Sequence, residues 1–420
     1  MKRILPLILL VYVVLLALFT TMVIVVHMIP RSAIEAQFKS SVKIFIEEGD
    51  YPIKGSLDGR VMLDNYTDCY MHNLAYCADA SHPVDAAMRN FRYRDNEVMT
   101  VSMSHLASGD LINEPFEYGK YWHGYLVFLR PLLTVMDYGK IRILNGIVLS
   151  ILLMVVLFLL TRRLSFGIAL CFIVSLFMVH SAVVPWSLQY STCYHITLVS
   201  MIAFLGFDWL SATRQRLVIS FFIIGAITSF LDFFTTPVMT LGLPLTVLVL
   251  MDRKLCHLRL LFALCVAWLM GYSLMWASKW LMAYLLAGYN ALEEATQSIM
   301  LQSVGQEENP IWYYWRELFD TFMTRWSIFT PQGLTRWGLV ALLAIPALLA
   351  PKRRPMLKRY SVLLFIAMLS LLWYIVVARH SYTHFIISSR SLLVFWFSGL
   401  SFLYSIIDFK KLKSHVFRKQ

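Results

Sequence analysis

The sequence predicts an all-α polytopic membrane protein with about ten transmembrane helices and a long first extracytoplasmic loop containing interfacial helices. Composition is the first reason: hydrophobic residues make up 59% of the 420 residues, charged residues only 15%, and the mean hydropathy is +0.64. Soluble domains carry about 25% charged residues. The second reason is the arrangement, because apolar runs long enough to cross a bilayer alternate with charged connections. A soluble globular enzyme is excluded.

The apolar runs divide the chain into spans and loops. The predicted spans are 4–29, 141–160, 164–183, 192–211, 217–232, 236–251, 260–288, 336–350, 360–378 and 391–408. The first follows Met1-Lys2-Arg3 and is too long for a cleaved signal peptide, so we expect it to remain as a helix. The predicted units are a first transmembrane helix (1–29), an extracytoplasmic loop (30–140), transmembrane helices two to seven (141–288), a second extracytoplasmic loop (289–335), transmembrane helices eight to ten (336–408) and a basic cytoplasmic tail (409–420).

The connections differ in charge on the two sides. One set has 19 basic residues and three acids, and the other has 17 basic residues and 22 acids. The basic set is Lys2, Arg3, Arg162, Arg163, Arg214, Arg216, Arg253, Lys254, Arg259, Lys352, Arg353, Arg354, Lys358, Arg359, Lys410, Lys411, Lys413, Arg418 and Lys419. Cytoplasmic loops are rich in Lys and Arg, so we expect both termini in the cytoplasm and the long polar segment outside. This asymmetry accounts for the net charge of +12 without nucleic acid.

An acidic stripe stands out in the first polar segment. Asp64, Asp68 and His72 are spaced four residues apart, so on a helix they share one face. Two carboxylates and an imidazole near a membrane surface could deprotonate an acceptor or hold a divalent metal ion. The alternative is a solvated helix face. Cys69 and Cys77 would be too far apart on one straight helix to form a disulfide.

Three other predicted outer elements carry polar or aromatic groups. Asp232 precedes a helix-breaking Pro237 at the outer end of two spans, and it is either a solvated turn residue or functional. The second loop is rich in Trp and Tyr, which suits an aromatic belt or an acceptor-binding lid. Basic residues at the mouth of the last two spans predict a phosphate site or, alternatively, a structural ion-pair network. They are Arg379, His380, His384 and Arg390.

In layout the chain resembles the GT-C class of integral membrane glycosyltransferases. A long outer loop follows the first span directly and contains the acidic motif Asp64-x-x-x-Asp68, where that class carries its catalytic acid. Interfacial helices are expected on both sides of it, at 33–48 and 118–138, and a second large outer loop lies towards the C-terminus. The strings LDNYTD, YWHGY and FTTP are similar to those of uncharacterised bacterial membrane proteins. The adjacent Asp-Glu or Asp-x-Asp of some members is absent, which leaves metal dependence open.

The resemblance implies transfer of a sugar from a polyprenyl-phosphate donor to an extracytoplasmic glycan, lipid or protein, with inversion, at the bacterial plasma membrane. Asp64 or Asp68 would be the base, with a slight preference for Asp68. The four basic residues at the mouth of the last spans would neutralise the donor phosphate. Sugar or acceptor binding would fall to Tyr121, Trp122, His123, Arg130 and Asp232.

Three other functions compete with this prediction. A cell-surface polysaccharide polymerase or ligase would use similar outer basic loops, usually late in the chain. A transporter of lipid-linked glycans would need ionisable groups near the bilayer midplane, and within the predicted spans we expect only Lys279 to be clearly buried. A receptor or assembly factor would need no chemistry at all.

Overall fold

The chain folds into helices that surround two main apolar cores. The computed structural model describes residues 4–53, 62–252, 257–303, 309–325, 327 and 331–417. Within these ranges there are helices and three isolated bridges but no strand. Most of the loop predicted at 50–60 and six of the basic residues counted above (Lys2, Arg3, Arg253, Lys254, Arg418 and Lys419) lie outside the described residues.

Six helical segments in the described part of the chain are long and apolar enough to cross a membrane. They are α1 (Ile4–His27), α7 (Tyr138–Arg163), α11 (Arg214–Leu231), α13 (Leu258–Ala287), the segment Met356–Val376 around α18 (Val362–Val376), and the segment Phe385–Ile406 ending in α21 (Leu393–Ile406). Three shorter apolar helices accompany them: α8 (Phe166–Met178), α12 (Val238–Met251) and most of α16 (Pro331–Leu349). The predicted class, an all-α membrane protein, is confirmed, whereas the number of ten spans is not.

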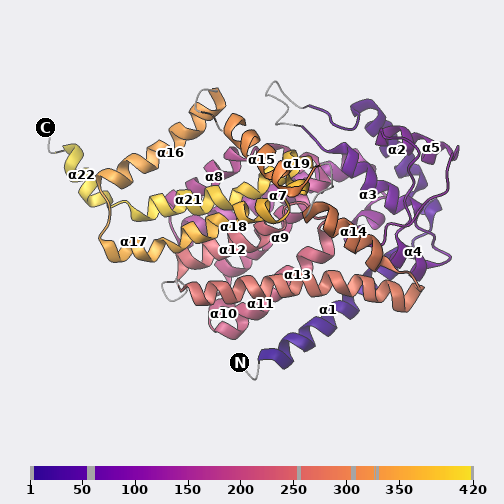
Figure 1. Ribbon diagram of the computed structural model, residues 1–420, viewed down its shortest axis with the longest axis horizontal. Coiled ribbons are helices and arrows are strands. Elements are labelled where there is room, and N and C mark those ends of the chain that lie inside the picture. Colours follow the sequence, from indigo (N-terminus) through magenta and orange to yellow (C-terminus); the bar gives the residue numbers. More distant parts are fainter. Residues whose placement is uncertain are drawn as a thin grey trace.

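The remaining helices are shorter or more polar. Between α1 and α7 lie α2 (Arg31–Glu48), α3 (Asn65–Cys77), α4 (Pro83–Arg89), α5 (Met99–Ser108) and α6 (Leu126–Leu132). Further along the chain are η1 (Ser181–Trp186), α9 (Leu188–Gly206), α10 (Asp208–Ser211), α14 (Ala291–Ser303), α15 (Ile311–Arg325), α17 (Arg354–Tyr360), α19 (Ala378–Thr383), α20 (Phe385–Ser388), η3 (Ser389–Leu392) and α22 (Phe409–Phe417). Figure 1 shows α2 to α5 gathered at one end of the long axis and the C-terminal α22 at the other end.

Glycines allow α11 and α13 to pack in direct backbone contact. A Cβ on Gly225 would collide with the main-chain oxygen of Trp268, and one on Gly271 would collide with that of Phe222. Small residues at such crossings let helix backbones approach closely, which is how helices associate where the hydrophobic effect is weak. The α4 helix of the unit between α1 and α7 packs against α13 of this pair (Figure 1).

The unit between α1 and α7, here called the loop unit, is largely as predicted at its start. The helix expected at 33–48 is α2. The sequence also predicts a short helix over 83–97, but α4 covers only Pro83–Arg89, because Asn90 adopts a left-handed φ of 52° and ends it. The helix α5 was not predicted. Its first N–H groups, on Met99 and Thr100, donate to the Asp50 carboxylate from another part of the unit.

The interfacial helix expected at 118–138 is wrong, because only Leu126–Leu132 is helical. The chain before it is pressed against the end of α11: the Gly124 N–H donates to the Phe230 carbonyl at 2.9 Å, and a Cβ on Gly124 would collide with that carbonyl. His123 has a left-handed φ of 52°. A continuous helix is incompatible with these backbone constraints.

Candidate functional site

The candidate site is built around the start of α3. Asp64 is the N-cap of this helix, and its Oδ1 accepts the Thr67 N–H at 3.0 Å. Aspartate is a favoured N-cap because its carboxylate accepts an N–H that the first turn leaves without an intrahelical partner. The residue is 3% exposed, and its Oδ2 is buried without a hydrogen-bond partner among the described residues. One carboxylate oxygen is thus used by the fold and the other is left for another group.

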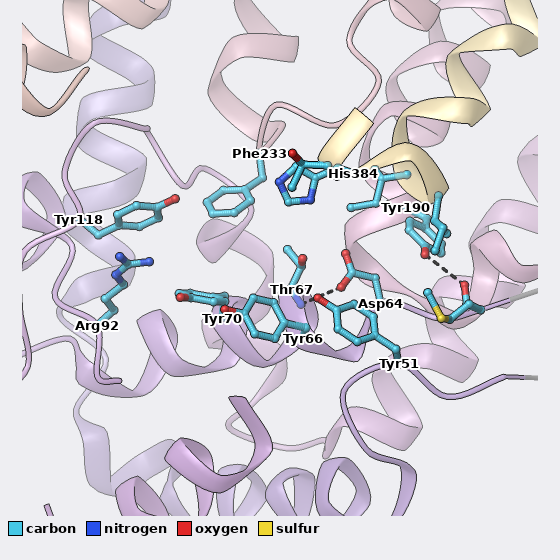
Figure 2. A pocket seen from close by; sticks show the side chains of 14 residues that line it. Tyr51, Asp64, Tyr66, Thr67, Tyr70, Arg92, Tyr118, Tyr190, Phe233 and His384 are labelled. Carbon is cyan, nitrogen blue, oxygen red and sulfur yellow. Dashed lines mark hydrogen bonds between the residues drawn. The ribbon is translucent and has the colours of Figure 1, made fainter. Parts of the chain in front are cut away.

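Asp64 lines a cavity of about 390 Å³ (Figure 2). This volume is within the range of about 300–1,000 Å³ that small-molecule sites occupy. Tyrosines dominate the lining, and Figure 2 shows Tyr66 and Tyr70 between Asp64 on one side and Arg92 with Tyr118 on the other. The full lining is Tyr51, Met62, Asp64, Tyr66, Thr67, Tyr70, Arg92, Tyr118, Tyr190, Phe233, Thr383, His384, Ile386 and Ile387. Such a wall offers flat apolar faces together with hydroxyl groups.

The tyrosines form a continuous aromatic surface. The rings of Tyr51 and Tyr66 are stacked with centroids 5.8 Å apart, and Tyr66 lies 5.3 Å from Tyr70. Tyr70 in turn lies 6.5 Å from Tyr118. Tyr66 and Tyr70 are four residues apart and therefore share one face of α3. The helix that Asp64 caps is the same helix that supplies the centre of the wall.

A buried arginine lies at the Asp64 end of the cavity. Arg390 is 2% exposed, and its guanidinium carbon lies 3.7 Å from the centroid of the Tyr190 ring, which lines the cavity. It donates to the Ile386 carbonyl, while its Nε is buried without a partner in the described chain. The guanidinium therefore keeps hydrogen-bonding capacity for an anion.

The buried environment of Asp64 raises the pKa of its carboxyl group. Burial raises the pKa of the carboxyl to about 6, while the Thr67 hydrogen bonds and the charge of Arg390 act in the opposite direction and the charge of Asp68 adds to the rise. A carboxyl with a pKa near the working pH is suited to act as a general base. Such a shift in a cavity marks a candidate functional residue.

Asp68 has a different environment. It is 0% exposed and accepts four hydrogen bonds: from Tyr138 Oη at 2.5 Å, Ser187 Oγ at 3.3 Å, and the main-chain N–H groups of Leu188 at 3.0 Å and Gln189 at 2.8 Å. The two N–H groups open α9, so Asp68 caps this helix from another part of the chain. Its carboxylate is fully occupied by the fold. The geometry therefore favours Asp64 as the base, whereas the sequence favoured Asp68 slightly.

His72 does not join the two carboxylates in a common site. Its Nδ1 bonds the Asp68 carbonyl at 2.8 Å, and its ring lies edge-on to Phe45 and Tyr138, each about 5.1 Å away. Burial lowers the pKa of His72 to about 4, and the hydrogen bond to the Asp68 carbonyl partly opposes this shift. Within the described ranges, no group of three or more His, Cys, Asp or Glu side chains is arranged to hold a metal ion. Cys69 and Cys77 are both free thiols on α3.

The basic residues expected to bind phosphate are separated by the fold. Arg390 and His384 are at the cavity, His384 as part of its lining. His380 is outside the lining, and its ring centroid lies 4.9 Å from the ring centroids of both Phe234 and His384. Burial, with a smaller effect of the His384 charge, lowers the pKa of His380 to about 3. Arg379 bonds the hydroxyl of Tyr314 on α15 through its Nε at 3.2 Å. Of the four, His384 alone lines the cavity with Asp64, and Arg390 lies against the lining residue Tyr190, where its charge acts on Asp64.

Most residues expected to bind the acceptor have structural contacts. Arg130 is fully buried and donates to three main-chain carbonyls, on Val26 of α1, on Ile29 just after α1 and on Ala75 of α3. Trp122 Nε1 donates to the Met275 carbonyl at 2.6 Å, which ties the loop unit to α13. These two side chains are placed away from the cavity lining.

The other three expected residues lie around the loop that carries Phe233. Asp232 accepts the Thr235 N–H at 2.8 Å and caps that turn. His123 bonds the Tyr118 carbonyl at 3.1 Å, and its ring lies 5.3 Å from Phe233. Tyr121 stacks on Trp276 at 5.9 Å and lies 5.5 Å from Phe233. They support a residue of the cavity wall without lining it.

Sequence reasoning missed Arg92 and most of the tyrosine wall. The spacing of Tyr66 and Tyr70 on the predicted helix was a signal for two of its members. Arg92, Tyr118 and Tyr190 come from separate segments, so only the packing of those segments brings them together.

Comparisons with known proteins add no relative, since no family model, no curated protein and no solved structure matches this chain. The fold and site define the class as an all-α membrane protein with a tyrosine-lined cavity that contains Asp64, Arg92 and His384.

Proposed function

We propose that the protein is a GT-C-like membrane glycosyltransferase that moves a sugar from a polyprenyl-phosphate donor to a glycan, lipid or protein acceptor. The observation that carries the proposal is the Asp64 carboxylate, which lines a cavity walled by tyrosines beside a buried arginine and has one oxygen without a hydrogen-bond partner in the described chain. Aromatic faces suit the apolar faces of sugar rings, and the carboxylate suits proton abstraction from a hydroxyl.

The reaction follows from the two charged groups. The acceptor hydroxyl oxygen attacks the anomeric carbon, Asp64 takes the hydroxyl proton, and the bond from the anomeric carbon to the phosphate oxygen breaks. The phosphate leaves with the bonding electron pair, and Arg390 stabilises its added charge. Direct displacement inverts the anomeric configuration. The step requires no metal ion, and any divalent metal dependence is a separate question.

A second cavity supports an amphiphilic donor. It has a volume of about 660 Å³ and is lined mostly by apolar side chains of α7, α8, η1 and α9. Tyr194 lines it, and Tyr190, four residues earlier on α9, lines the polar cavity. Residues four apart share a helix face, so the two cavities border the same side of α9. An isoprenoid chain would occupy the apolar cavity while its sugar phosphate reaches Arg390.

The finer topology belongs to the same proposal. Ten spans would result if α8, α9, α12 and α16 also cross the bilayer, each with its basic end in the cytoplasm. The loop unit and the cavity would then face the outside of a bacterial plasma membrane. Lys279 gives little support to a transporter, because its Nζ donates to the Ala87 and Met88 carbonyls at 2.8 and 3.0 Å and joins α13 to α4.

The test is sugar transfer in membranes that contain the protein and a radiolabelled pool of polyprenyl-phosphate sugars. We expect consumption of the pool by the wild type and a loss of about 100-fold or more with Asp64→Asn, the scale of a general base. Asp137→Asn is the matched control, since Asp137 caps α7 through the Lys140 N–H in the same way. Wild-type transfer by Asp64→Asn at equal expression would refute the proposal.

A further inference from the structure

An arginine lines the cavity on the side away from Asp64. The guanidinium carbon of Arg92 lies 3.9 Å from the ring centroid of Tyr118, 4.6 Å from that of Phe116 and 5.0 Å from that of Tyr70. Figure 2 shows Arg92 below Tyr118 and across the cavity from Asp64. Three aromatic rings thus hold this cation in place.

The charge of Arg92 has no acidic partner in the described part of the chain. Its Nε is buried and lacks an acceptor there. Two other arginines are paired, by contrast: Arg89 with Asp85 and Glu117, and Arg142 of α7 with Glu48 at 2.9 Å. A half-buried arginine with an unsatisfied donor is costly unless something supplies the missing acceptor.

A second cation beside the same ring is already neutralised. Lys120 Nζ lies 5.0 Å from the Tyr118 centroid, but it pairs with Glu294 at 3.3 Å and donates to Ser298 at 2.7 Å. Arg92 is therefore the arginine of the cavity lining that lacks a carboxylate partner among the described residues. The charge of Arg94, which is outside the lining, also acts on Tyr66 and Tyr70.

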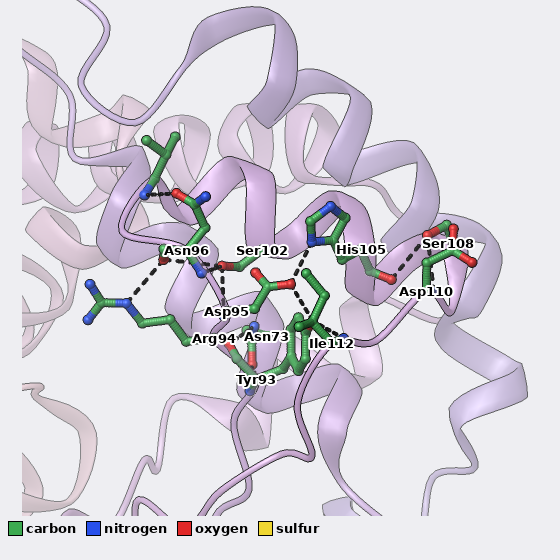
Figure 3. A network of polar contacts seen from close by, with 11 residues as sticks. Asn73, Tyr93, Arg94, Asp95, Asn96, Ser102, His105, Ser108, Asp110 and Ile112 are labelled. Atoms are coloured by element: carbon green, nitrogen blue, oxygen red, sulfur yellow. Dashed lines mark hydrogen bonds and ion pairs between the residues drawn. The ribbon is translucent and has the colours of Figure 1, made fainter.

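The backbone that carries Arg92 is held firmly by its neighbours. The Asn73 amide donates to the Tyr93 carbonyl at 2.9 Å and accepts the Tyr93 N–H at 2.8 Å. The Tyr93 hydroxyl donates to Asp95, which also bonds His105 at 2.5 Å (Figure 3). Arg92 also forms an isolated antiparallel bridge with Phe116, in which the two residues exchange main-chain hydrogen bonds of 2.9 and 2.8 Å. The guanidinium is thus preorganised for a ligand.

We propose that Arg92 binds an anionic substituent, a carboxylate or a phosphate, on the saccharide that occupies the cavity. A planar guanidinium presents paired N–H donors that match either group. The location across the cavity from Asp64 separates this anion from the reacting hydroxyl, so the two negative charges do not meet. The inference rests on the proposed function only in taking the occupant to be a saccharide, and it narrows that saccharide to an acidic class such as a uronic acid or a sugar phosphate.

The test measures binding alone, without transfer. Purified protein in detergent is titrated with glucose, sodium glucuronate and glucose 6-phosphate at equal ionic strength, and binding is followed by saturation-transfer NMR. We expect at least one anion to bind about tenfold tighter than glucose, because hydrogen bonds to charged groups contribute about that much. A preference for glucuronate indicates a carboxylate substituent, and one for glucose 6-phosphate indicates a phosphate.

Variants identify the residue responsible. Arg92→Gln should abolish the preference for the anion over glucose. The matched control is Arg31→Gln, because the Arg31 guanidinium also lies over a tyrosine, 4.1 Å from the Tyr76 centroid, but outside the cavity lining. The inference is overturned if the wild type binds none of the three sugars or shows no preference, if Arg92→Gln keeps the preference, or if Arg31→Gln loses it as well. A failed transfer assay combined with an anion preference that depends on Arg92 would refute the transferase and leave the anion site standing.

Discussion

Replacing Asp64 by Asn should abolish transfer and stabilise the fold at the same time. The folded-state pKa of about 6 stands above the ordinary value of 3.8, because burial disfavours the charged form. At about 1.4 kcal/mol per pKa unit, keeping the carboxylate ionised in the folded state costs up to about 3 kcal/mol above pH 6. Asparagine has nearly the same shape, carries no charge and is also a good N-cap, so the Thr67 hydrogen bond can be kept.

The stability gained by Asp64→Asn should depend on pH in a defined direction. Because the folded pKa is raised, the favourable contribution of Asp64 is present in full below about pH 4 and is lost as the pH rises to about 6. The advantage of Asp64→Asn in the free energy of unfolding should therefore be small at pH 4, grow to about pH 6 and then stay level. Wild-type transfer should rise over the same range, because the base must be deprotonated.

Thermal unfolding in detergent, followed by tryptophan fluorescence at pH 4, 5, 6 and 7.5, checks this prediction alongside the transfer assay. Asp137→Asn is again the control. Although burial acts to raise it, the hydrogen bonds and charge of Lys140 hold the pKa of Asp137 below its ordinary value, so this variant should gain no stability. An Asp64→Asn melting temperature equal to that of the wild type at pH 7.5, or a gain that is the same at pH 4, would refute the reasoning.

Three further substitutions test the packing. Asp68→Asn should lower stability by about 1–3 kcal/mol, because whichever way the amide turns, one main-chain N–H at the start of α9 faces an NH₂ group; equal melting temperatures would contradict this. Arg130→Gln should lower the free energy of unfolding by about 3 kcal/mol or more, because three main-chain carbonyls lose their donor, while the folded protein keeps its sugar affinity. A variant that loses sugar affinity but keeps wild-type stability would support the acceptor-binding role of Arg130. Gly225→Ala should lower the free energy of unfolding by about 1–3 kcal/mol, because the new Cβ pushes α11 away from the Trp268 carbonyl. The control is Gly206→Ala, because a Cβ at Gly206 meets open space.

Local signals accounted for much of the secondary structure. Long apolar runs predicted the membrane helices, the amphipathic stretch predicted α2, and Pro83 predicted the start of α4. The interfacial helix at 118–138 failed, because its apolar composition did not reveal that Gly124 contacts the Phe230 carbonyl. The number of ten spans depends on helices too short or too polar to be judged by hydropathy alone.

By itself the sequence determined that the chain is an all-α membrane protein and that Asp64 and Asp68 lie four residues apart in its first long polar segment, because composition and spacing are local properties. That α3 begins directly after Asp64 is a finding of the structure. The tertiary structure alone decided their roles. It directs Asp68 to the start of α9, where four donors occupy it, and leaves one buried oxygen of Asp64, beside the cavity, without a hydrogen-bond partner among the described residues. It also collects Arg92, Tyr118, Tyr190 and Arg390 around that cavity from distant segments. Burial and hydrogen-bond partners depend on long-range packing, and they separate a capping carboxylate from a candidate base.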